Sequence, residues 1–271
     1  LQFGPETSTA NRCVIGGMLG NNSCGLHSLV YGSVREHILE VDAILSDGSE
    51  TTFKPLTKTE FQQKLNGNPN QLEKAIYTNI SDTLSKPEHQ KEIREQFPTP
   101  QLTPRNIGYA IDEMLNSEIF TENGPQFNFC KLLAGSEGTL AFSHRIKLNV
   151  IPLPPKYKGL VCAHFVTLEE SLLGNLIALK HKPTAIELMD DIVMDAAKQN
   201  IEQNKNRFFV KGEPGALLMI EFSFETEKEL TEKAAALEKD FRDAGLGYQF
   251  PLVNGADNIK LGWALLTTCP L

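Results

Sequence analysis

The second half of the chain alternates short apolar segments with longer amphipathic ones, and this alternation limits the folds that are open to it. The apolar segments have the length and composition of strands and occupy residues 159–166, 184–189, 215–224 and 248–253. The segments between them have helical character and occupy residues 167–181, 190–203 and 226–245. Such alternation is compatible with a doubly wound parallel sheet, but the small size of this region favours a ferredoxin-like α+β layer.

Two of these helices carry N-terminal capping signals. Thr167 stands before Glu169 and Glu170, and Thr226 stands three residues before Glu229, which is the spacing of a capping box. We therefore expect one helix to begin after each threonine.

A proline-rich stretch, PLPP at residues 152–155, separates this region from the first half of the chain. A chain of 271 residues is long enough for two modest cores, so we predict two domains, 1–155 and 156–271. In the first domain, residues 38–53 have the pattern of strand, tight turn and strand, with Asp47-Gly48 at the turn, which predicts a β-hairpin. A further strand is predicted because apolar residues recur at even spacing at Leu140, Phe142, Ile146, Leu148 and Val150.

Residues 56–127 differ in composition from the segments on either side, since they are rich in Gln, Lys, Glu and Asn. Apolar residues recur there at three- and four-residue steps, which predicts an amphipathic helix; they are Leu72, Ala75, Ile76, Ile80 and Leu84. The prolines of FPTPQLTP, residues 97–104, end this pattern. We interpret the block as a helical insertion between two parts of one sheet.

Charge and cysteine content exclude several classes of function. The net charge is −8, from 26 Lys and Arg against 34 Asp and Glu, which opposes general binding of nucleic acid. The five cysteines (Cys13, Cys24, Cys130, Cys162 and Cys269) are scattered and form no CxxC pair or metal-ligand spacing. A reduced, cytoplasmic location is expected, with no metal site and no membrane span. The chain begins at Leu1, and we expect it to be a piece of a longer protein.

The segment STANRCVIGGMLGNNSCGLHSLVYG, residues 8–32, is unusually rich in glycine. Glycine lets backbone N–H groups approach a ligand closely, and successive amides form a concave site for anionic oxygens. The segment matches neither GxGxxG in a βαβ unit nor GxxxxGK[ST], the two common nucleotide fingerprints. From the residues alone it is either a structural turn or an anion site.

Residues 3–48 and 132–155 resemble the FAD-binding domain of the vanillyl-alcohol-oxidase type of flavoproteins. The resemblance rests on family order in the segments PETST, IGG, NNSCG, YG, DG and GSEGT. It extends to PTAIELMDD, residues 183–191, which resembles a strand-to-helix junction of the substrate domain. Within that superfamily the chain is most similar to the D-lactate, glycolate and D-2-hydroxyglutarate dehydrogenases, and among them to long members with an iron–sulfur region.

The resemblance implies an α+β fold, in which the second part of the FAD-binding domain carries the insertion and is followed by a ferredoxin-like substrate domain. It also implies an FAD cofactor, a small 2-hydroxy-acid substrate, and an electron acceptor that the sequence does not identify. The residues that it assigns to cofactor binding are Pro5, Glu6, Thr7, Ser8, Ile15, Gly16, Gly17, Asn21, Asn22, Ser23, Gly25, Tyr31, Gly135, Ser136, Glu137, Gly138 and Thr139.

Some parts of the family pattern have no counterpart here. The first glycine-rich phosphate loop would precede residue 1, and the histidines that supply the catalytic base would follow residue 271. In WALL, residues 263–266, Leu266 stands where the family has a substrate-binding arginine. No catalytic residue is therefore assigned, and we expect the isolated chain to bind FAD weakly or not at all and to lack turnover. A non-catalytic flavin-binding or scaffold module stays open as the alternative.

Several other residues are better explained by structure than by chemistry. We expect His27, His37 and His144 to be scaffold or solvent-exposed residues, because lone histidines are seldom ligands. We expect inert thiols at Cys13 and Cys24. Asp190 and Asp191 resemble a metal pair, but they fit the start of a helix better.

Overall fold

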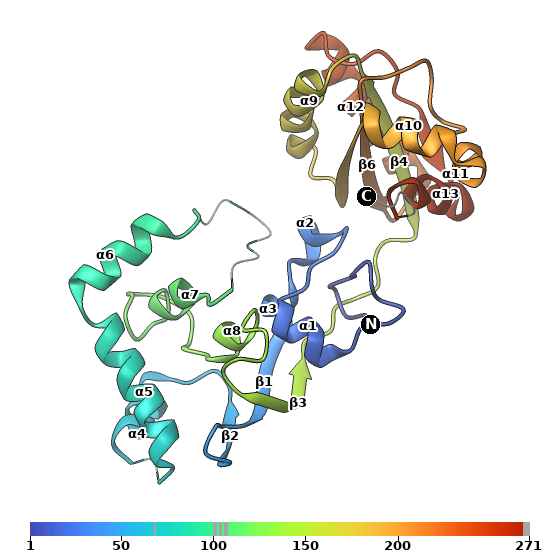
Figure 1. Ribbon diagram of the computed structural model, residues 1–271. Helices are drawn as coiled ribbons and strands as arrows, with labels where there is room; N and C mark the ends of the chain where they lie inside the picture. Colours follow the sequence, from blue (N-terminus) through green and yellow to red (C-terminus); the bar gives the residue numbers. More distant parts are fainter. Residues whose placement is uncertain (68, 100–101, 103–104, 106–107, 268–271) are drawn as a thin grey trace. The chain divides into compact units, whose positions relative to one another are not determined.

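The computed structural model describes residues 1–67, 69–99, 102, 105 and 108–267. The chain forms two compact units, Leu1–Pro152 and Leu153–Leu271 (Figure 1). The division falls inside the proline-rich stretch in which the sequence places its boundary.

The first unit contains a three-stranded antiparallel sheet in the order β2-β1-β3. Its strands are β1 (Ile38–Ile44), β2 (Glu50–Phe53) and β3 (Phe142–Leu148). The predicted hairpin is β1 and β2, and Gly48 at its turn has a φ of 85°, which favours glycine. The insertion separates β2 from β3 in the sequence, yet β3 pairs directly with β1.

The glycine-rich segment before β1 is more helical than the sequence suggests. It forms three short helices, α1 (Ile15–Asn21), α2 (Ser28–Tyr31) and α3 (Val34–His37). The buried side chains of Met18 and Leu19 anchor α1 to the core, which compensates for the poor helix propensity of its glycines.

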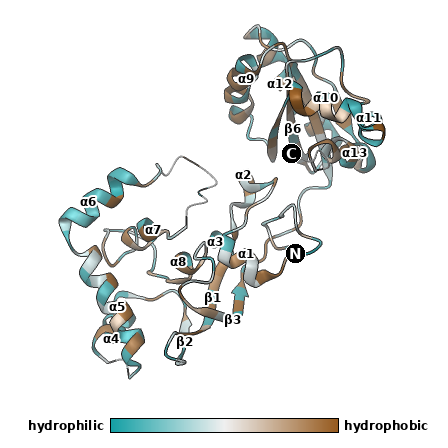
Figure 2. Ribbon diagram, in the orientation of Figure 1, coloured by the Kyte–Doolittle hydropathy of each residue, from teal (hydrophilic) through white to brown (hydrophobic). Residues whose placement is uncertain are grey.

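The insertion is helical, as predicted. It contains α4 (Lys58–Asn66), α5 (Gln71–Leu84), α6 (Pro87–Gln96) and α7 (Ile111–Leu115), and α8 (Cys130–Leu133) follows it. The predicted amphipathic helix is α5, and α6 is hydrophilic along most of its length (Figure 2). Of the proline-rich stretch 97–104, residues 100, 101, 103 and 104 lie outside the described residues.

A buried carboxylate and an aromatic cluster hold the insertion against the sheet. Glu73 of α5 accepts hydrogen bonds from Thr51 Oγ1 of β2 at 2.5 Å and from Lys64 Nζ of α4 at 2.6 Å. The rings that pack together beneath it are Phe61, Tyr77, Phe127 and Phe129. Paired in this way, the Glu73 carboxylate is buried without a lone charge.

The second unit is a four-stranded sheet in the order β5-β6-β4-β7, with every neighbouring pair antiparallel. The strands are β4 (Tyr157–Phe165), β5 (Ala185–Asp190), β6 (Ala216–Phe224) and β7 (Leu252–Asn254). This order is the ferredoxin-like one, and the antiparallel pairing rules out a doubly wound parallel sheet.

Helices cover both faces of this sheet. α9 (Leu168–Lys180) and α12 (Glu227–Asp243) pack on one face, and α10 (Asp191–Gln199) and α13 (Ala256–Thr267) pack on the other. The helix predicted at 190–203 is interrupted at Asn200, whose side chain caps a separate helix, α11 (Ile201–Asn206). The capping signals at Thr167 and Thr226 are confirmed, because each threonine accepts a hydrogen bond from the N–H three residues later.

Candidate functional site

Two glycine-rich segments that are far apart in the sequence lie side by side in the first unit. The N–H of Gly135 donates to Leu19 O at 3.0 Å, and the N–H of Glu137 donates to Gly20 O at 2.9 Å. In addition, Asn21 Nδ2 donates to Glu137 Oε1 at 3.3 Å. The loop 135–139 is thus fixed to the end of α1 by hydrogen bonds from both backbone and side chain.

A cavity of about 270 Å³ lies between α1 and this loop, and we call it the α1 cavity. Its lining residues are Gly16, Leu19, Gly20, Leu133, Ser136, Gly138, Ala141, Phe142 and Ser143. Three of the sequence-predicted residues, Gly16, Ser136 and Gly138, therefore share one cavity. The apolar wall supplied by α8 and β3 was not predicted.

The backbone at the entrance to the α1 cavity is open. Apart from the chain neighbours and the backbone of α1 itself, no atom of the described residues lies within 4 Å of the position that a Cβ would take on Gly16 or on Gly138. Val14, the residue before α1, has an apolar side chain that makes no cap hydrogen bond to the first turn. Bare amides beside a polar and apolar wall suit a ligand that has both anionic and apolar parts.

The loop conformation depends on residues with positive φ. Glu137 has a φ of 51°, which is uncommon for a residue with a side chain, and Gly138 has a φ of 73°. Hydrogen bonds at the Glu137 amide and carboxylate hold it in this conformation. Strained backbone of this kind is often found at ligand sites.

A second junction joins the loop 5–8 to Gly25. A Cβ on Gly25 would lie 1.2 Å from Glu6 O, so only glycine allows this approach. Glu6 Oε2 also lies 2.6 Å from Nδ1 of the buried His27. Pro5 is buried, whereas Glu6 and Ser8 are exposed and Thr7 is half-buried. His27 therefore belongs to the scaffold of this loop, as predicted.

The two adjacent asparagines have different environments. Asn22 is buried in a left-handed conformation at the end of α1, and its Oδ1 accepts hydrogen bonds from Ser33 Oγ and from the Arg35 N–H. Asn21 is exposed and lies next to Glu137, and its Oδ1 accepts a hydrogen bond from Ser23 Oγ. Asn22 thus maintains the scaffold, while Asn21 is presented to solvent beside the loop.

Tyr31 lies apart from the α1 cavity. It lines a different cavity, of about 410 Å³, together with Arg35, Glu36 and His37. Its carbonyl lies 2.7 Å from Nε2 of the buried His37, so this histidine also has a structural partner. Of the remaining predicted residues, Ile15 and Gly17 are exposed at the start of α1. The Oγ1 of Thr139 donates a hydrogen bond to Ser136 O at 2.6 Å.

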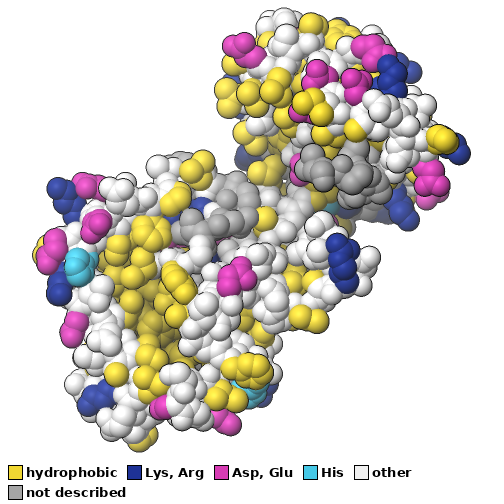
Figure 3. Space-filling view, in the orientation of Figure 1, with side chains coloured by type: hydrophobic (Ala, Val, Ile, Leu, Met, Phe, Trp, Pro, Cys, Tyr) yellow, Lys and Arg dark blue, Asp and Glu magenta, His cyan; other side chains and the backbone are white. Residues whose placement is uncertain are grey.

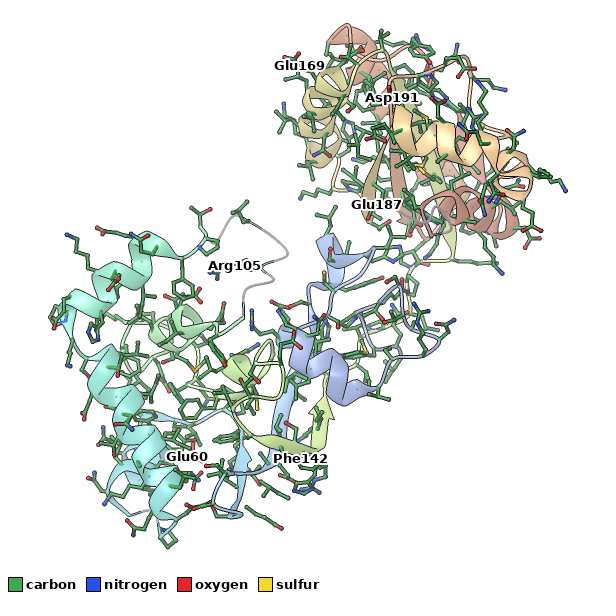
Figure 4. The ribbon with its side chains drawn as sticks, in the orientation of Figure 1. Glu60, Arg105, Phe142, Glu169, Glu187 and Asp191 are labelled. Carbon is green, nitrogen blue, oxygen red and sulfur yellow. The ribbon has the colours of Figure 1, made fainter. Side chains whose placement is uncertain are left out.

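β3 forms as predicted, but its apolar residues do not all lie on one face. Phe142, labelled at the start of β3 in Figure 4, is 69 % exposed, while Ile146 and Leu148 are half-buried. A register shift in the pairing with β1 puts Ile146 opposite the buried Val41 but Phe142 opposite Ile44. The even spacing of the apolar residues therefore does not keep Phe142 on the face of Ile146. An apolar cavity of about 260 Å³ adjoins the α1 cavity and shares Leu133 and Ala141 with it.

Other candidate residues have structural roles in the described part of the chain. Burial raises the pKa of the Cys130 thiol to about 12 and also raises the pKa of Cys162, so both are inert. Cys13 and Cys24 are half-buried and free of disulfides, and Cys269 lies outside the described residues. Asp190 caps α10 by accepting a hydrogen bond from the Val193 N–H at 2.9 Å.

In the second unit the predicted WALL segment lies on α13. Trp263 Nε1 donates to Oε2 of the buried Glu221 at 3.0 Å, and Leu266 packs beside the core on that face of the sheet. Within the described ranges, no three His, Cys, Asp or Glu residues are grouped as metal ligands. No helix of the described residues is long and apolar enough to cross a membrane.

Comparison with known families gives two matches. The FAD binding domain model matches residues 1–54, and the model of the C-terminal domain of FAD linked oxidases matches residues 154–265. These matches cover α1 to β2 of the first unit and most of the second unit.

Curated relatives agree with these matches. A D-2-hydroxyglutarate dehydrogenase from Haemophilus influenzae is 28% identical over 244 residues, which are 88% of this chain and 23% of the relative. One from Pseudomonas putida is 28% identical over 267 residues, which are 96% of this chain and 25% of the relative. The glycolate oxidase subunit GlcD of Escherichia coli is 23% identical over 203 residues, 74% of this chain and 28% of that subunit. The chain thus spans about a quarter of the length of these relatives.

Among solved structures, an alkyldihydroxyacetonephosphate synthase superposes with a TM-score of 0.50 at 12% sequence identity. The superposition covers 97% of this chain and 39% of the synthase, and it supports the fold.

The two family matches indicate FAD as the cofactor, and the α1 cavity can be tested for its fit to that molecule. At about 270 Å³ the cavity is below the usual range for a whole ligand of this size, so it would hold one portion of the dinucleotide. The open backbone at Gly16 and Gly138 suits phosphate oxygens, and the wall at Leu133 and Phe142 suits a flat apolar ring. Fold, cavity and matched segments agree, and the chain belongs to the FAD-linked oxidases, with parts of both the FAD-binding and the C-terminal domain.

Proposed function

We propose that this chain is part of an FAD-dependent oxidoreductase that oxidises a D-2-hydroxy acid of the lactate, glycolate or 2-hydroxyglutarate type. The chain is similar to D-2-hydroxyglutarate dehydrogenases along most of its length, which favours the 2-hydroxyglutarate type among the three. Bound FAD would supply the hydride acceptor for the hydroxyl-bearing carbon of the substrate.

The observation that carries this proposal is the junction of α1 with the loop 135–139. Gly16, whose Cβ position is open, lines one side of the α1 cavity, and Ser136 and Gly138 line the other side. Gly17 and Thr139 are their neighbours in the chain. Anionic oxygens of the cofactor would be held by the backbone N–H groups of these residues, because no Lys or Arg lines the α1 cavity among the described residues. The exposed Glu137 carboxylate would repel a phosphate, so we expect it to accept a hydroxyl group instead.

A different portion of the cofactor would lie along the loop 5–8. Glu6, His27 and Gly25 fix this loop, and Thr7 and Ser8 carry hydroxyl groups that can bind a polar chain. Asn22 and Tyr31 would act indirectly, since Asn22 is buried in the scaffold and Tyr31 lines a different cavity.

The alternative is a flavin-binding or scaffold module without turnover of its own. The presence of Leu266 supports this alternative for the isolated chain, because a leucine cannot make the charge-assisted hydrogen bonds that hold a substrate carboxylate. An iron–sulfur electron acceptor, which the similarity to long dehydrogenases suggests, would also lie outside this chain.

The test is a titration of the 271-residue chain with FAD, followed by quenching of flavin fluorescence. We expect weak, saturable binding that Gly16→Glu abolishes, because this change places both bulk and negative charge on the open backbone. Gly67→Glu is the matched control, since Gly67 is exposed at the end of α4 and distant in sequence from both glycine segments. Equal binding by both variants would refute the assignment of the α1 cavity.

A turnover assay distinguishes a chain that is catalytic by itself from a flavin-binding or scaffold module without activity. With D-2-hydroxyglutarate, D-lactate or glycolate, FAD and a dye acceptor, we expect no dye reduction above the rate of free FAD. Dye reduction by the wild-type chain that Gly16→Glu removes would instead show that the chain is catalytic by itself.

A further inference from the structure

Helix α9 of the second unit exposes its large apolar residues and buries its small ones. The residues that face the sheet are Ser171, Gly174 and Ala178, all of them fully buried or nearly so. The residues on the opposite face are 42–60 % exposed; they are Leu168, Leu172, Leu173, Leu176 and Leu179. Figure 3 shows hydrophobic side chains gathered over this helix. Apolar patches of a few hundred Å² on a folded domain commonly mark an interaction surface.

The orientation of α9 is fixed, so the helix cannot rotate to bury its leucines. A Cβ on Gly174 would lie 2.7 Å from the ring of Phe165, which means that the helix backbone rests directly on the sheet. At the N-terminal end, Glu170 accepts hydrogen bonds from the N–H groups of Val166 at 2.9 Å and Gly247 at 2.6 Å. At the C-terminal end, Nε2 of His181 lies 2.8 Å from Asp240 Oδ2 of α12. The exposed leucines are therefore a stable feature of this unit.

Opposite charges stand at the two ends of the exposed face. Glu169 lies in the first turn of α9 and Lys180 in the last turn, and both side chains are exposed. Within the described ranges, neither side chain has an ion-pair or hydrogen-bond partner. When two copies of this helix pack antiparallel about a two-fold axis, Glu169 of each copy faces Lys180 of the other, and Leu173 faces Leu176. In this arrangement leucine meets leucine and each carboxylate meets an ammonium group, so the face is complementary to itself in charge.

We propose that two copies of this chain associate through α9, packed antiparallel across a two-fold axis with the leucine face at the centre. The helix is about 20 Å long, and burial of both leucine faces would cover on the order of 1,000 Å² in total, the size at which specific interfaces begin. Such an interface gives a reversible dimer, and it also involves the two reciprocal ion pairs between Glu169 and Lys180.

Sedimentation of the 271-residue chain across micromolar concentrations tests the proposal. We expect a monomer–dimer equilibrium in which Leu176→Asp weakens association by at least about 100-fold, because each dimer loses two buried leucines worth about tenfold each. Leu261→Asp is the matched control: this leucine is 42 % exposed on α13, away from the α9 face, and its replacement should leave the dimer unchanged.

Charge reversal tests the antiparallel arrangement itself. At low salt we expect Glu169→Lys and Lys180→Glu each to weaken the dimer by about tenfold, and the double variant to recover to within about threefold of the wild type. Far-UV circular dichroism establishes that each variant is folded. A chain that stays monomeric, or a dimer that Leu176→Asp leaves unchanged, overturns the proposal. A double variant that is weaker than both single variants overturns the antiparallel arrangement.

Discussion

Replacement of Gly25 by alanine would force apart two backbone segments that the cofactor-site scaffold holds in contact. An ideal Cβ on Gly25 would lie 1.2 Å from Glu6 O and 2.3 Å from Glu6 C. Both are backbone atoms, so no side-chain rotation can relieve the overlap, and the loop 5–8 must move. Overpacking typically costs 1–3 kcal/mol, and we expect about 3 kcal/mol of lost stability in the first unit. The movement would also separate Glu6 Oε2 from His27 Nδ1, now 2.6 Å apart.

Gly16→Ala is the matched control for this change. Its Cβ would meet no atom within 4 Å, and Gly16 lies inside α1, so alanine should stabilise the unit by about 0.5–1 kcal/mol. The assay is urea unfolding followed by far-UV circular dichroism. Trp263, the sole tryptophan, lies in the second unit, and its fluorescence serves as the internal reference. A Gly25→Ala chain that unfolds at the wild-type urea concentration would refute the close packing of Gly25 against Glu6.

Three further predictions concern the second unit and use urea midpoints read from Trp263 fluorescence. Gly174→Leu should lower the midpoint by an amount equivalent to about 2–4 kcal/mol, because even the Cβ of the new side chain would lie 2.7 Å from the Phe165 ring. An unchanged midpoint would contradict this packing. Burial lowers the pKa of His164, whose Nε2 accepts a hydrogen bond from the Lys211 N–H at 3.0 Å. As the pH falls, this histidine is therefore protonated in the unfolded state before it is protonated in the native state. The midpoint should therefore fall as the pH drops below about 6.5, and His164→Gln should flatten this dependence. Burial raises the pKa of Glu187, so ionisation of this side chain opposes folding at neutral pH. Glu187→Gln should therefore raise the urea midpoint at pH 7. This gain should disappear as the pH falls below the pKa of the glutamate in the unfolded state, about 4.5.

Local patterns in the sequence are sufficient to identify most of the elements. The apolar steps from Leu72 to Leu84 identify α5, and Asp47-Gly48 identifies the turn of the hairpin. Periodicity and turn chemistry depend on neighbours in the chain, so no knowledge of distant residues is needed. The alternation after residue 156 likewise locates the strands and helices of the second unit, whereas the small size of this region is what favours the ferredoxin-like order.

The details of the site depend on contacts between distant residues and could not be predicted in the same way. Asn21 and Asn22 are adjacent, but only the partners Ser33 and Glu137 determine which of them is buried and which is exposed. The periodicity of α9 would place its leucines against the sheet. The Phe165 ring, which lies on β4, leaves space only for a glycine at position 174, so this side of α9 faces the sheet and the leucines face outward.

The resemblance of the glycine-rich segments to a flavoprotein family identifies residues that converge at α1, although it does not predict their arrangement. Gly16, Ser136 and Gly138 share the α1 cavity, whereas Tyr31 lies beside another cavity. The contribution of Phe142 follows from the pairing of β3 with β1 across the insertion, which no local pattern reports.

The most direct test of FAD binding at the α1 cavity is amide chemical-shift mapping of the isotope-labelled chain during titration with FAD. We expect the shifts to concentrate on residues 14–21 and 135–139, with smaller changes at 5–8, and to be absent from Gly16→Glu. Amides of α4 and α5, which contribute no residue to the α1 cavity, should stay unchanged. If the shifts instead concentrate outside these segments, or if saturating FAD shifts no amide of α1, the proposed cofactor site is wrong.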